Sequence, residues 1–311
     1  MKILRAYKTE ISVNNKQQTM LLQHLGCARW AYNFALAKKK EAFDKKEKIP
    51  NSIELHRELN KLKKTDYTWL YESSKAAPQE AMRDCDKAFQ NFFREIKKKN
   101  RKIGFPKFKS KKNDKQSFRL TGLIKVLDNG YIQLPRLGKL KLFERDYLRQ
   151  DSKILSATVS NRADRWFVSI QVEEDYEEKS NGNVIVGVDL GIKALATCSD
   201  GTVHENPKAL KKNLKKLKRK QRQLSRKRKE SKNREKAKQK LSKLHYRISN
   251  IRKDCLHKTT SKIINDNQVI ILEDLKISNM IKNHNLAQSI SDVGMYEFRR
   301  QIEYKSIWNR R

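Results

Sequence analysis

The sequence predicts an α+β protein of several domains, and three observations support this fold class. Its 311 residues are enough for two or three domains with cores of their own. Apolar residues follow helical spacing over residues 15–100, whereas short alternating runs separated by turn signals fill residues 117–172. After residue 182, two short apolar runs flank a long basic helical stretch, which is typical of two parallel strands joined by a crossover.

The charge indicates a polyanionic partner. The chain holds 72 Lys and Arg against 35 Asp and Glu, which gives a formal charge of +37. This excess is too large for an ordinary soluble enzyme, and it favours nucleic acid over a membrane surface as the partner. No apolar run approaches the length that crosses a bilayer, and the N-terminus has no apolar signal core.

The cysteine pattern indicates a reducing environment. The four cysteines are isolated in the sequence and form no CxxC pair, so the sequence shows no zinc site. We expect each to fill a core position as a small apolar side chain and the protein to be cytoplasmic. These residues are Cys27, Cys85, Cys198 and Cys255.

The first hundred residues are expected to contain one strand followed by a helical domain. Residues 1–13 alternate apolar and basic side chains and are interrupted at Asn14. Leu21, Leu25 and Ala28 begin the apolar stripe of a first helix, and Ala81, Cys85 and Ala88 belong to that of a helix over 74–99. The sequence therefore predicts a helical domain at 15–100, inserted after a first strand.

Residues 104–112, with the sequence GFPKFKSKK, interleave aromatic and basic side chains. Phe105 and Phe108 could stack on bases while Lys107 and Lys109 contact phosphates. The two phenylalanines could equally anchor a basic loop, and the sequence does not separate these interpretations. The short strands that follow predict a small β-barrel or curved sheet, which the first strand would join. Residues 173–183 read as a linker.

A carboxylate within an apolar strand is the feature around which the second half is arranged. Asp189 lies in the run Val184 to Leu190 between Gly187 and Gly191, and Ser199-Asp200-Gly201 predicts a hairpin turn further on. A charge in a buried-looking strand needs a metal, a cation or a hydrogen-bonded network. An acid at a frayed strand end is the simpler alternative.

A second strand, residues 268–274, ends in another acid, Glu273. Because the carboxyl ends of parallel strands meet at one sheet edge, Asp189 and Glu273 are expected to lie side by side. Two hard oxygen donors suit Mg²⁺ or Mn²⁺ and metal-assisted phosphoryl transfer. Asp274 should point to the opposite face as a cap or surface acid.

Residues 208–256 predict an antiparallel helical hairpin with a basic exterior. The segment Lys208 to Lys253 carries 22 Lys and Arg and two Glu, a net charge of +20, and it keeps a heptad-spaced apolar stripe. Unneutralised charge of this size would destabilise the fold, so we expect the hairpin to contact a phosphate backbone. The candidate contact residues are Lys218, Arg219, Lys220, Arg226, Arg228 and Arg234.

With these segments in view, the chain resembles the TnpB (OrfB) family of transposon-encoded, RNA-guided DNA endonucleases, which are related to type V CRISPR effectors. The matching segments are RWAYNFAL, AFQNFF, GFPKFKSKK, GVDLGIKALAT, LSRKRKESKNR, KLHYRISNIRKDCLHK, ILEDLKISNMIKNHNLAQSISD and FRRQIEYK. The resemblance implies a wedge-like β-barrel from 1–14 and 101–178 and a helical recognition domain at 15–100. It also implies an RNase H-like RuvC nuclease domain at 182–311 that contains the hairpin, with guide RNA and target DNA as partners.

By the same resemblance, Asp189 and Glu273 are the first and second catalytic acids, with Mg²⁺ or Mn²⁺ as cofactor. The family carries a further strand, a four-cysteine zinc ribbon and a third catalytic Asp after EYK, and these are not found before Arg311. We therefore expect a C-terminally truncated member with impaired catalysis. Asp292 is a weaker candidate for a third metal ligand.

Three other functions are compatible with the sequence. The chain could be guided to DNA by RNA without cutting it, it could be a strand-joining transposase, or it could be a general basic RNA-binding protein. No tyrosine stands beside a paired-histidine motif, which disfavours strand joining. Retention of both Asp189 and Glu273 favours cleavage over binding alone.

Overall fold

The computed structural model describes residues 2–98, 104–112, 116–144, 148, 152–175 and 184–311. The chain divides into two compact units, Lys2–Glu174 and Asp175–Arg311. Each unit has its own apolar core. No helix in the described ranges is long and apolar enough to span a membrane.

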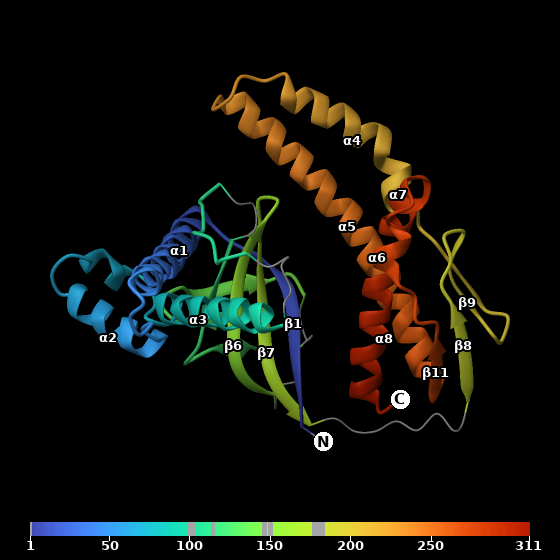
Figure 1. Ribbon diagram of the computed structural model, residues 1–311, viewed down its shortest axis with the longest axis horizontal. Coiled ribbons are helices and arrows are strands. Elements are labelled where there is room, and N and C mark those ends of the chain that lie inside the picture. The colour runs from blue at the N-terminus through green and yellow to red at the C-terminus, as the bar shows by residue number, and fades with distance from the viewer. Residues whose placement is uncertain (1, 99–103, 113–115, 145–147, 149–151, 176–183) are drawn as a thin grey trace. The chain divides into compact units, whose positions relative to one another are not determined.

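The first unit combines a helical layer with an antiparallel sheet (Figure 1). Its helices are α1 (Asn15–Asp44), α2 (Ser52–Leu62), the short 3-10 helix η1 (Thr68–Glu72) and α3 (Ala76–Lys97). Its strands are β1 (Lys2–Ser12), β2 (Gln116–Leu120), β3 (Lys125–Leu127), β4 (Tyr131–Leu134), β5 (Gly138–Leu142), β6 (Lys153–Arg162) and β7 (Arg165–Asp175).

The helices of this unit begin where the sequence supplies caps. Asn14 accepts the backbone N–H of Gln17, whose side chain accepts the N–H of Asn14 in return, so α1 starts with a capping box. Asn51 and Glu54 close the start of α2 in the same way. Buried side chains of α1 and α3 then pack with those of the strands into one core.

The sheet of the first unit is open, so the expectation of a β-barrel was wrong. Its strand order is β2-β6-β7-β1-β5-β4-β3. Among the described residues the two edge strands, β2 and β3, do not pair with each other. A barrel removes both edges by closing the hydrogen-bond ladder, whereas β3 is only three residues long and ends the sheet. The first strand does join this sheet, as expected.

The second unit is built on a four-stranded mixed sheet of order β10-β9-β8-β11. The strands are β8 (Ile185–Asp189), β9 (Ala194–Cys198), β10 (Val203–Glu205) and β11 (Val269–Leu272). β8, β9 and β10 form a meander, and β11 pairs with β8 in parallel. The predicted hairpin turn between β9 and β10 is present, with Gly201 at φ 83°.

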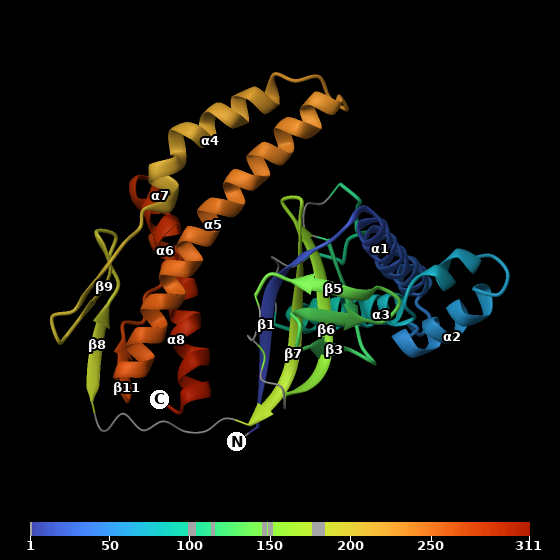
Figure 2. The ribbon, with the colours of Figure 1, turned by 180° about the vertical axis from the view of Figure 1, so that it is seen from behind.

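Two long helices, α4 (Ala209–Ser225) and α5 (Lys232–Asp266), connect β10 to β11. Figures 1 and 2 show them side by side as an antiparallel hairpin. The predicted apolar stripe holds them together through a buried cluster that contains Leu217, Leu244 and Ile248. The helices α6 (Ile277–Met280), α7 (His284–Val293) and α8 (Met295–Asn309) follow β11.

One face of the second sheet is covered and the other is open. Val186, Val188 and Leu195 point into a core with α5 and α8, where Phe298 is fully buried. On the opposite face Ile185 and Ile271 remain about 60% exposed. Because successive strand residues alternate between faces, Asp189 shares the open face with Ile185.

Candidate functional site

The two acids predicted to work together occupy matching positions on neighbouring strands. In the parallel pair of β8 and β11, Val188 lies opposite Leu272. Asp189, the last residue of β8, follows Val188, and Glu273 directly follows Leu272 at the end of β11. Neighbouring strands lie about 4.8 Å apart, and opposed residues of a parallel pair point to the same face. The parallel pairing predicted from the sequence is confirmed.

Both carboxylates are exposed and available for a ligand. Within the described ranges, neither Asp189 nor Glu273 takes part in a salt bridge or a side-chain hydrogen bond. Asp274 behaves differently, because its carboxylate pairs with Arg299 on α8. The interpretation of Asp274 as a surface acid is therefore confirmed.

The backbone around Asp189 is shaped by two glycines. The Gly187 N–H donates to Ser199 Oγ at 3.0 Å, and Ser199 N–H donates to Gly187 O at 2.8 Å, which ties β8 to the hairpin turn. A Cβ at Gly191 would lie 3.2 Å from the carbonyl oxygen of Ala194. The chain can therefore reverse direction two residues after Asp189 without a steric clash.

The donor set at this edge fits a hard divalent cation. Mg²⁺ is commonly held by one or two carboxylates, with water and substrate phosphates completing its octahedron. Two adjacent carboxylates meet that need. Within the described residues, no group of three or more His, Cys, Asp or Glu side chains is placed to hold a metal.

Asp292 has a structural role at the start of α4. Its side chain is buried, at 5% exposure, and its two oxygens accept the backbone N–H groups of Leu210 and Lys211 at 2.9–3.1 Å. Arg252 lies 3.8 Å from the same carboxylate. Asp292 thus caps a helix 82 residues away in the sequence, and the expectation that it approaches the metal is not supported.

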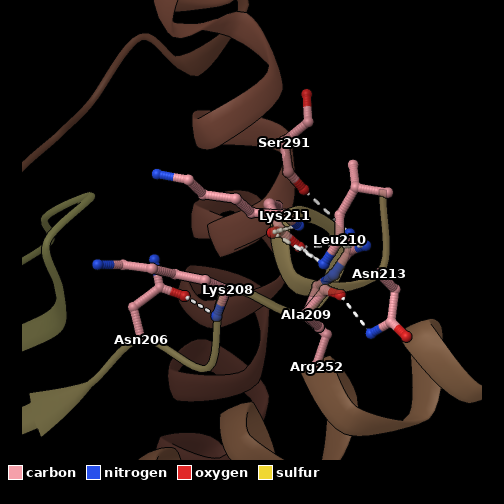
Figure 3. A network of polar contacts seen from close by, with 9 residues as sticks. Asn206, Lys208, Ala209, Leu210, Lys211, Asn213, Arg252 and Ser291 are labelled. Atoms are coloured by element: carbon pink, nitrogen blue, oxygen red, sulfur yellow. Dashed lines mark hydrogen bonds and ion pairs between the residues drawn. The ribbon is translucent and has the colours of Figure 1, made fainter. Parts of the chain in front are cut away.

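Figure 3 shows how the residues before α4 are held. Asn206 accepts the N–H of Lys208 at 2.9 Å, and its side-chain amide donates to Ile192 O at 2.8 Å. Lys208 adopts the left-handed conformation, with φ 48° and ψ 45°. The connection after β8 and the start of α4 are therefore joined through one asparagine. The sequence analysis missed this role, although Asn-Pro before a helical pattern is a recognised turn signal.

The helical hairpin carries the predicted basic surface with one exception. Lys218, Arg219, Arg226 and Arg228 are exposed. Lys220 and Arg226 line a pocket of about 510 Å³ between α4 and α5, together with Gln223, Lys227, Asn233, Lys236, Ala237 and Lys240. Arg234 instead donates to the carbonyl oxygens of Leu224 and Lys227, both at 2.9 Å. Its guanidinium therefore closes the end of α4.

The two phenylalanines of the loop 104–112 have different surroundings, and the sequence left open whether they anchor the loop or stack on bases. Phe105 packs against Phe43, Phe89 and Phe92, so it anchors the loop. Phe108 remains 55% exposed, as a base-stacking residue would be.

The two lysines of this loop also differ. The Lys109 ammonium lies 4.0 Å from the centre of the Tyr32 ring, and burial of that end lowers the pKa of Lys109 although the residue is exposed as a whole. The backbone of Lys109 is bonded in both directions to the Asn33 side chain. Lys107 is exposed, so it is the better placed of the two to meet a phosphate.

The sequence matches two family descriptions. Residues 167–284 match OrfB_IS605, described as "Probable transposase". Residues 1–48 match HTH_OrfB_IS605, described as "Helix-turn-helix domain". In the structure, residues 1–48 contain β1 and α1, and residues 167–284 contain Asp189, Glu273 and the helical hairpin.

Curated relatives extend the match to the whole chain. InsQ of Escherichia coli K12, named an RNA-guided DNA endonuclease, is 35% identical over 99% of this chain and 79% of its own length. A Streptomyces pristinaespiralis protein with the same designation is 33% identical over 98% of this chain and 75% of its own.

A solved structure shares the fold. The cryo-EM structure of a Cas12f1–sgRNA–target DNA complex aligns with a TM-score of 0.56 at 13% identity, over 99% of this chain and 88% of that one. The chain has a mixed α/β, Cas12f-like fold, and the protein belongs to the TnpB/OrfB transposase family, whose relatives above are named RNA-guided DNA endonucleases.

Proposed function

We propose that this protein is an RNA-guided DNA endonuclease with a RuvC-like site at the edge formed by β8 and β11. The observation that carries the proposal is that Asp189 and Glu273 each directly follow the last pair of the parallel strands, Val188 and Leu272, with both carboxylates exposed. Membership of a family whose curated relatives are named RNA-guided DNA endonucleases supports it. The cofactor we propose is Mg²⁺ or Mn²⁺.

In this proposal the two strands would hold the acids side by side for phosphodiester hydrolysis. Asp189 and Glu273 would each offer carboxylate oxygens to the same divalent ion, and the rigid parallel pairing would keep their spacing constant. The bound ion would supply charge stabilisation at the scissile phosphate and lower the pKa of an attacking water. The open face leaves room for a nucleic-acid strand to reach the carboxylates.

Guide RNA and target DNA are the partners that we propose. The net charge of +37, concentrated in α4 and α5, provides sequence-independent contact with phosphate backbones. Base pairing by a guide would then supply sequence specificity, while the protein reads backbone shape and a short flanking motif. The four cysteines have free thiols, which is compatible with a location in the reducing cytoplasm.

A second candidate is RNA-guided DNA binding without cleavage. The observation in its favour is that only two carboxylates gather at this edge among the described residues, because Asp292 caps α4. A nuclease site with two acidic ligands depends on water and substrate oxygens for the rest of its coordination. Such a protein would keep its affinity for guide and target but would cut slowly or not at all.

A cleavage experiment separates the two candidates. The chain would be expressed with the DNA that flanks its gene, the co-purifying RNA sequenced, and the complex incubated with a matched plasmid in Mg²⁺ or in EDTA. We expect cleavage that needs Mg²⁺ and is lost in Asp189→Asn and Glu273→Gln. Asp274→Asn is the matched control, because Asp274 neighbours Glu273 but is paired with Arg299. Guided binding without cleavage by the wild-type protein would favour the second candidate.

A further inference from the structure

A pocket at the base of the helical hairpin has no role in the site described above. Its volume is about 360 Å³, and it is lined by three parts of the second unit: the connection after β8, the start of α4 and helix α7. The lining residues are Ile192, Lys193, Asn206, Lys208, Lys211, Leu214, Gln288, Ser289 and Asp292. All of them belong to one compact unit.

The pocket has an excess of positive charge. Lys193, Lys208 and Lys211 contribute three ammonium groups, and within the described chain none of them forms a salt bridge. The only carboxylate in the lining, Asp292, accepts two backbone N–H groups and faces Arg252. Its charge is therefore already compensated, and the three lysines remain available for an anion.

Hydrogen bonds fix the backbone of the segments that carry these lysines. Asn206 fixes the backbone of Lys208 and also bonds the carbonyl of Ile192, the residue before Lys193. The side chains of Lys208 and Lys211 extend to the same side of the start of α4 (Figure 3). An anion in the pocket would thus meet ammonium groups from two segments that Asn206 connects.

The anion would not be bound by the amino end of α4. Asp292 already occupies the N–H groups of Leu210 and Lys211. The ligand must therefore be one that flexible ammonium groups recognise as a point charge, with Gln288 and Ser289 able to add hydrogen bonds. A phosphate group fits this description.

The position of the pocket indicates which phosphate it would take. Ile192 follows Asp189 by three residues, so their Cα atoms are at most about 11 Å apart, roughly three nucleotides at a 3.4 Å rise. We propose that Lys193, Lys208 and Lys211 bind a phosphodiester of the DNA strand presented to Asp189 and Glu273. This inference rests on the proposed function, because it assumes that the edge receives DNA.

The test compares two triple variants that remove the same charge. Lys193→Gln/Lys208→Gln/Lys211→Gln empties the pocket of ammonium groups. Lys212→Gln/Lys215→Gln/Lys216→Gln removes three exposed lysines of α4 that do not line it. The full-length proteins would be titrated with a fluorescein-labelled 20-nucleotide single-stranded DNA at several KCl concentrations. Loss of one phosphate contact should reduce the slope of log K against log[KCl] by about 0.7 in the pocket variant, beyond any change in the control.

A single variant separates binding from folding. Lys208→Gly removes one ammonium while relieving the left-handed backbone at φ 48°. We expect a higher melting temperature together with weaker DNA binding. A Lys208→Gly protein that bound DNA as the wild type does would overturn the proposal, as would equal slopes in the two triple variants.

An RNA 20-mer of the same sequence identifies the strand. If the pocket variant loses affinity for RNA and keeps it for DNA, the pocket belongs to the guide and the proposal fails. The binding measurement needs neither a guide nor cleavage. Failure of the proposed function would therefore appear separately, as a wild-type protein that does not cut matched DNA although its two triple variants still differ in DNA binding.

Discussion

Replacing Asp292 by alanine removes the acceptor that closes the start of α4, and we expect a large loss of stability. In the native protein the carboxylate is 5% exposed and accepts the N–H groups of Leu210 and Lys211. In the variant these two donors would lose their charged partner at a helix start that has no other side-chain cap. Arg252, whose guanidinium is 3.8 Å away, would lose its counter-charge as well.

The magnitude follows from these contacts. A hydrogen bond to a charged group contributes about 1.5–3 kcal/mol, and loss of an N-cap costs about 0.5–2 kcal/mol. Because the two donors share one carboxylate and Arg252 is partly exposed, we expect Asp292→Ala to lower the free energy of unfolding by about 2–4 kcal/mol. Asp292→Asn retains a neutral hydrogen-bond acceptor and should lower the free energy of unfolding by about 1 kcal/mol.

Urea unfolding followed by circular dichroism measures the loss, and hydrogen exchange locates it. We expect faster exchange in peptides that cover residues 207–214 and unchanged exchange in the first unit. A change below about 0.5 kcal/mol in Asp292→Ala, with unaltered exchange at the start of α4, would refute the capping role. Such a result would restore Asp292 as a candidate metal ligand.

Three further predictions concern single side chains. Burial lowers the pKa of His24, whose Nδ1 lies 2.8 Å from Met20 O and whose Nε2 accepts the Ser74 N–H. Because the unfolded chain then binds a proton more readily than the folded protein, the free energy of unfolding should fall as the pH drops below about 6.5. His24→Gln should reduce the change in the free energy of unfolding between about pH 7.5 and 5.5, measured by urea unfolding at each pH. The same pH dependence in the variant and the wild type would contradict this prediction. Lys208→Gly should raise the free energy of unfolding by about 1 kcal/mol, because glycine adopts positive φ without a Cβ clash, and unchanged urea stability would contradict this. Arg234→Gln should lower the free energy of unfolding by about 1–2 kcal/mol and speed amide hydrogen exchange over residues 224–231. Arg228 is exposed, so Arg228→Gln should weaken nucleic-acid binding without a change in stability. Equal free energies of unfolding in the two variants would contradict the role of Arg234.

Local patterns were sufficient to predict the strands and helices near the site. The apolar runs before Asp189 and Glu273 are short, and a long helical segment separates them, which favours a parallel pair. The heptad stripe of the hairpin likewise predicts the contact between α4 and α5 because both halves carry it.

The features that the sequence does not reveal depend on contacts between distant residues. Whether a sheet closes is decided by the register and length of its edge strands, and alternating runs in the sequence do not encode whether β2 meets β3. Asp292 looks like any acid on an amphipathic helix until its partner, 82 residues away, is known. Arg234 belongs to a run of similar basic residues, and only the fold shows that its guanidinium bonds the end of α4.

The most direct test of the central claim, that Asp189 and Glu273 form one divalent-cation site, is a Mn²⁺ titration followed by electron paramagnetic resonance. The full-length wild type would be compared with Asp189→Asn, Glu273→Gln and Asp274→Asn. We predict that each of the first two weakens Mn²⁺ binding at least about 10-fold, because each removes a ligand, whereas Asp274→Asn binds as the wild type does. Unchanged affinity in Asp189→Asn or Glu273→Gln, or an equal loss in Asp274→Asn, would contradict the claim.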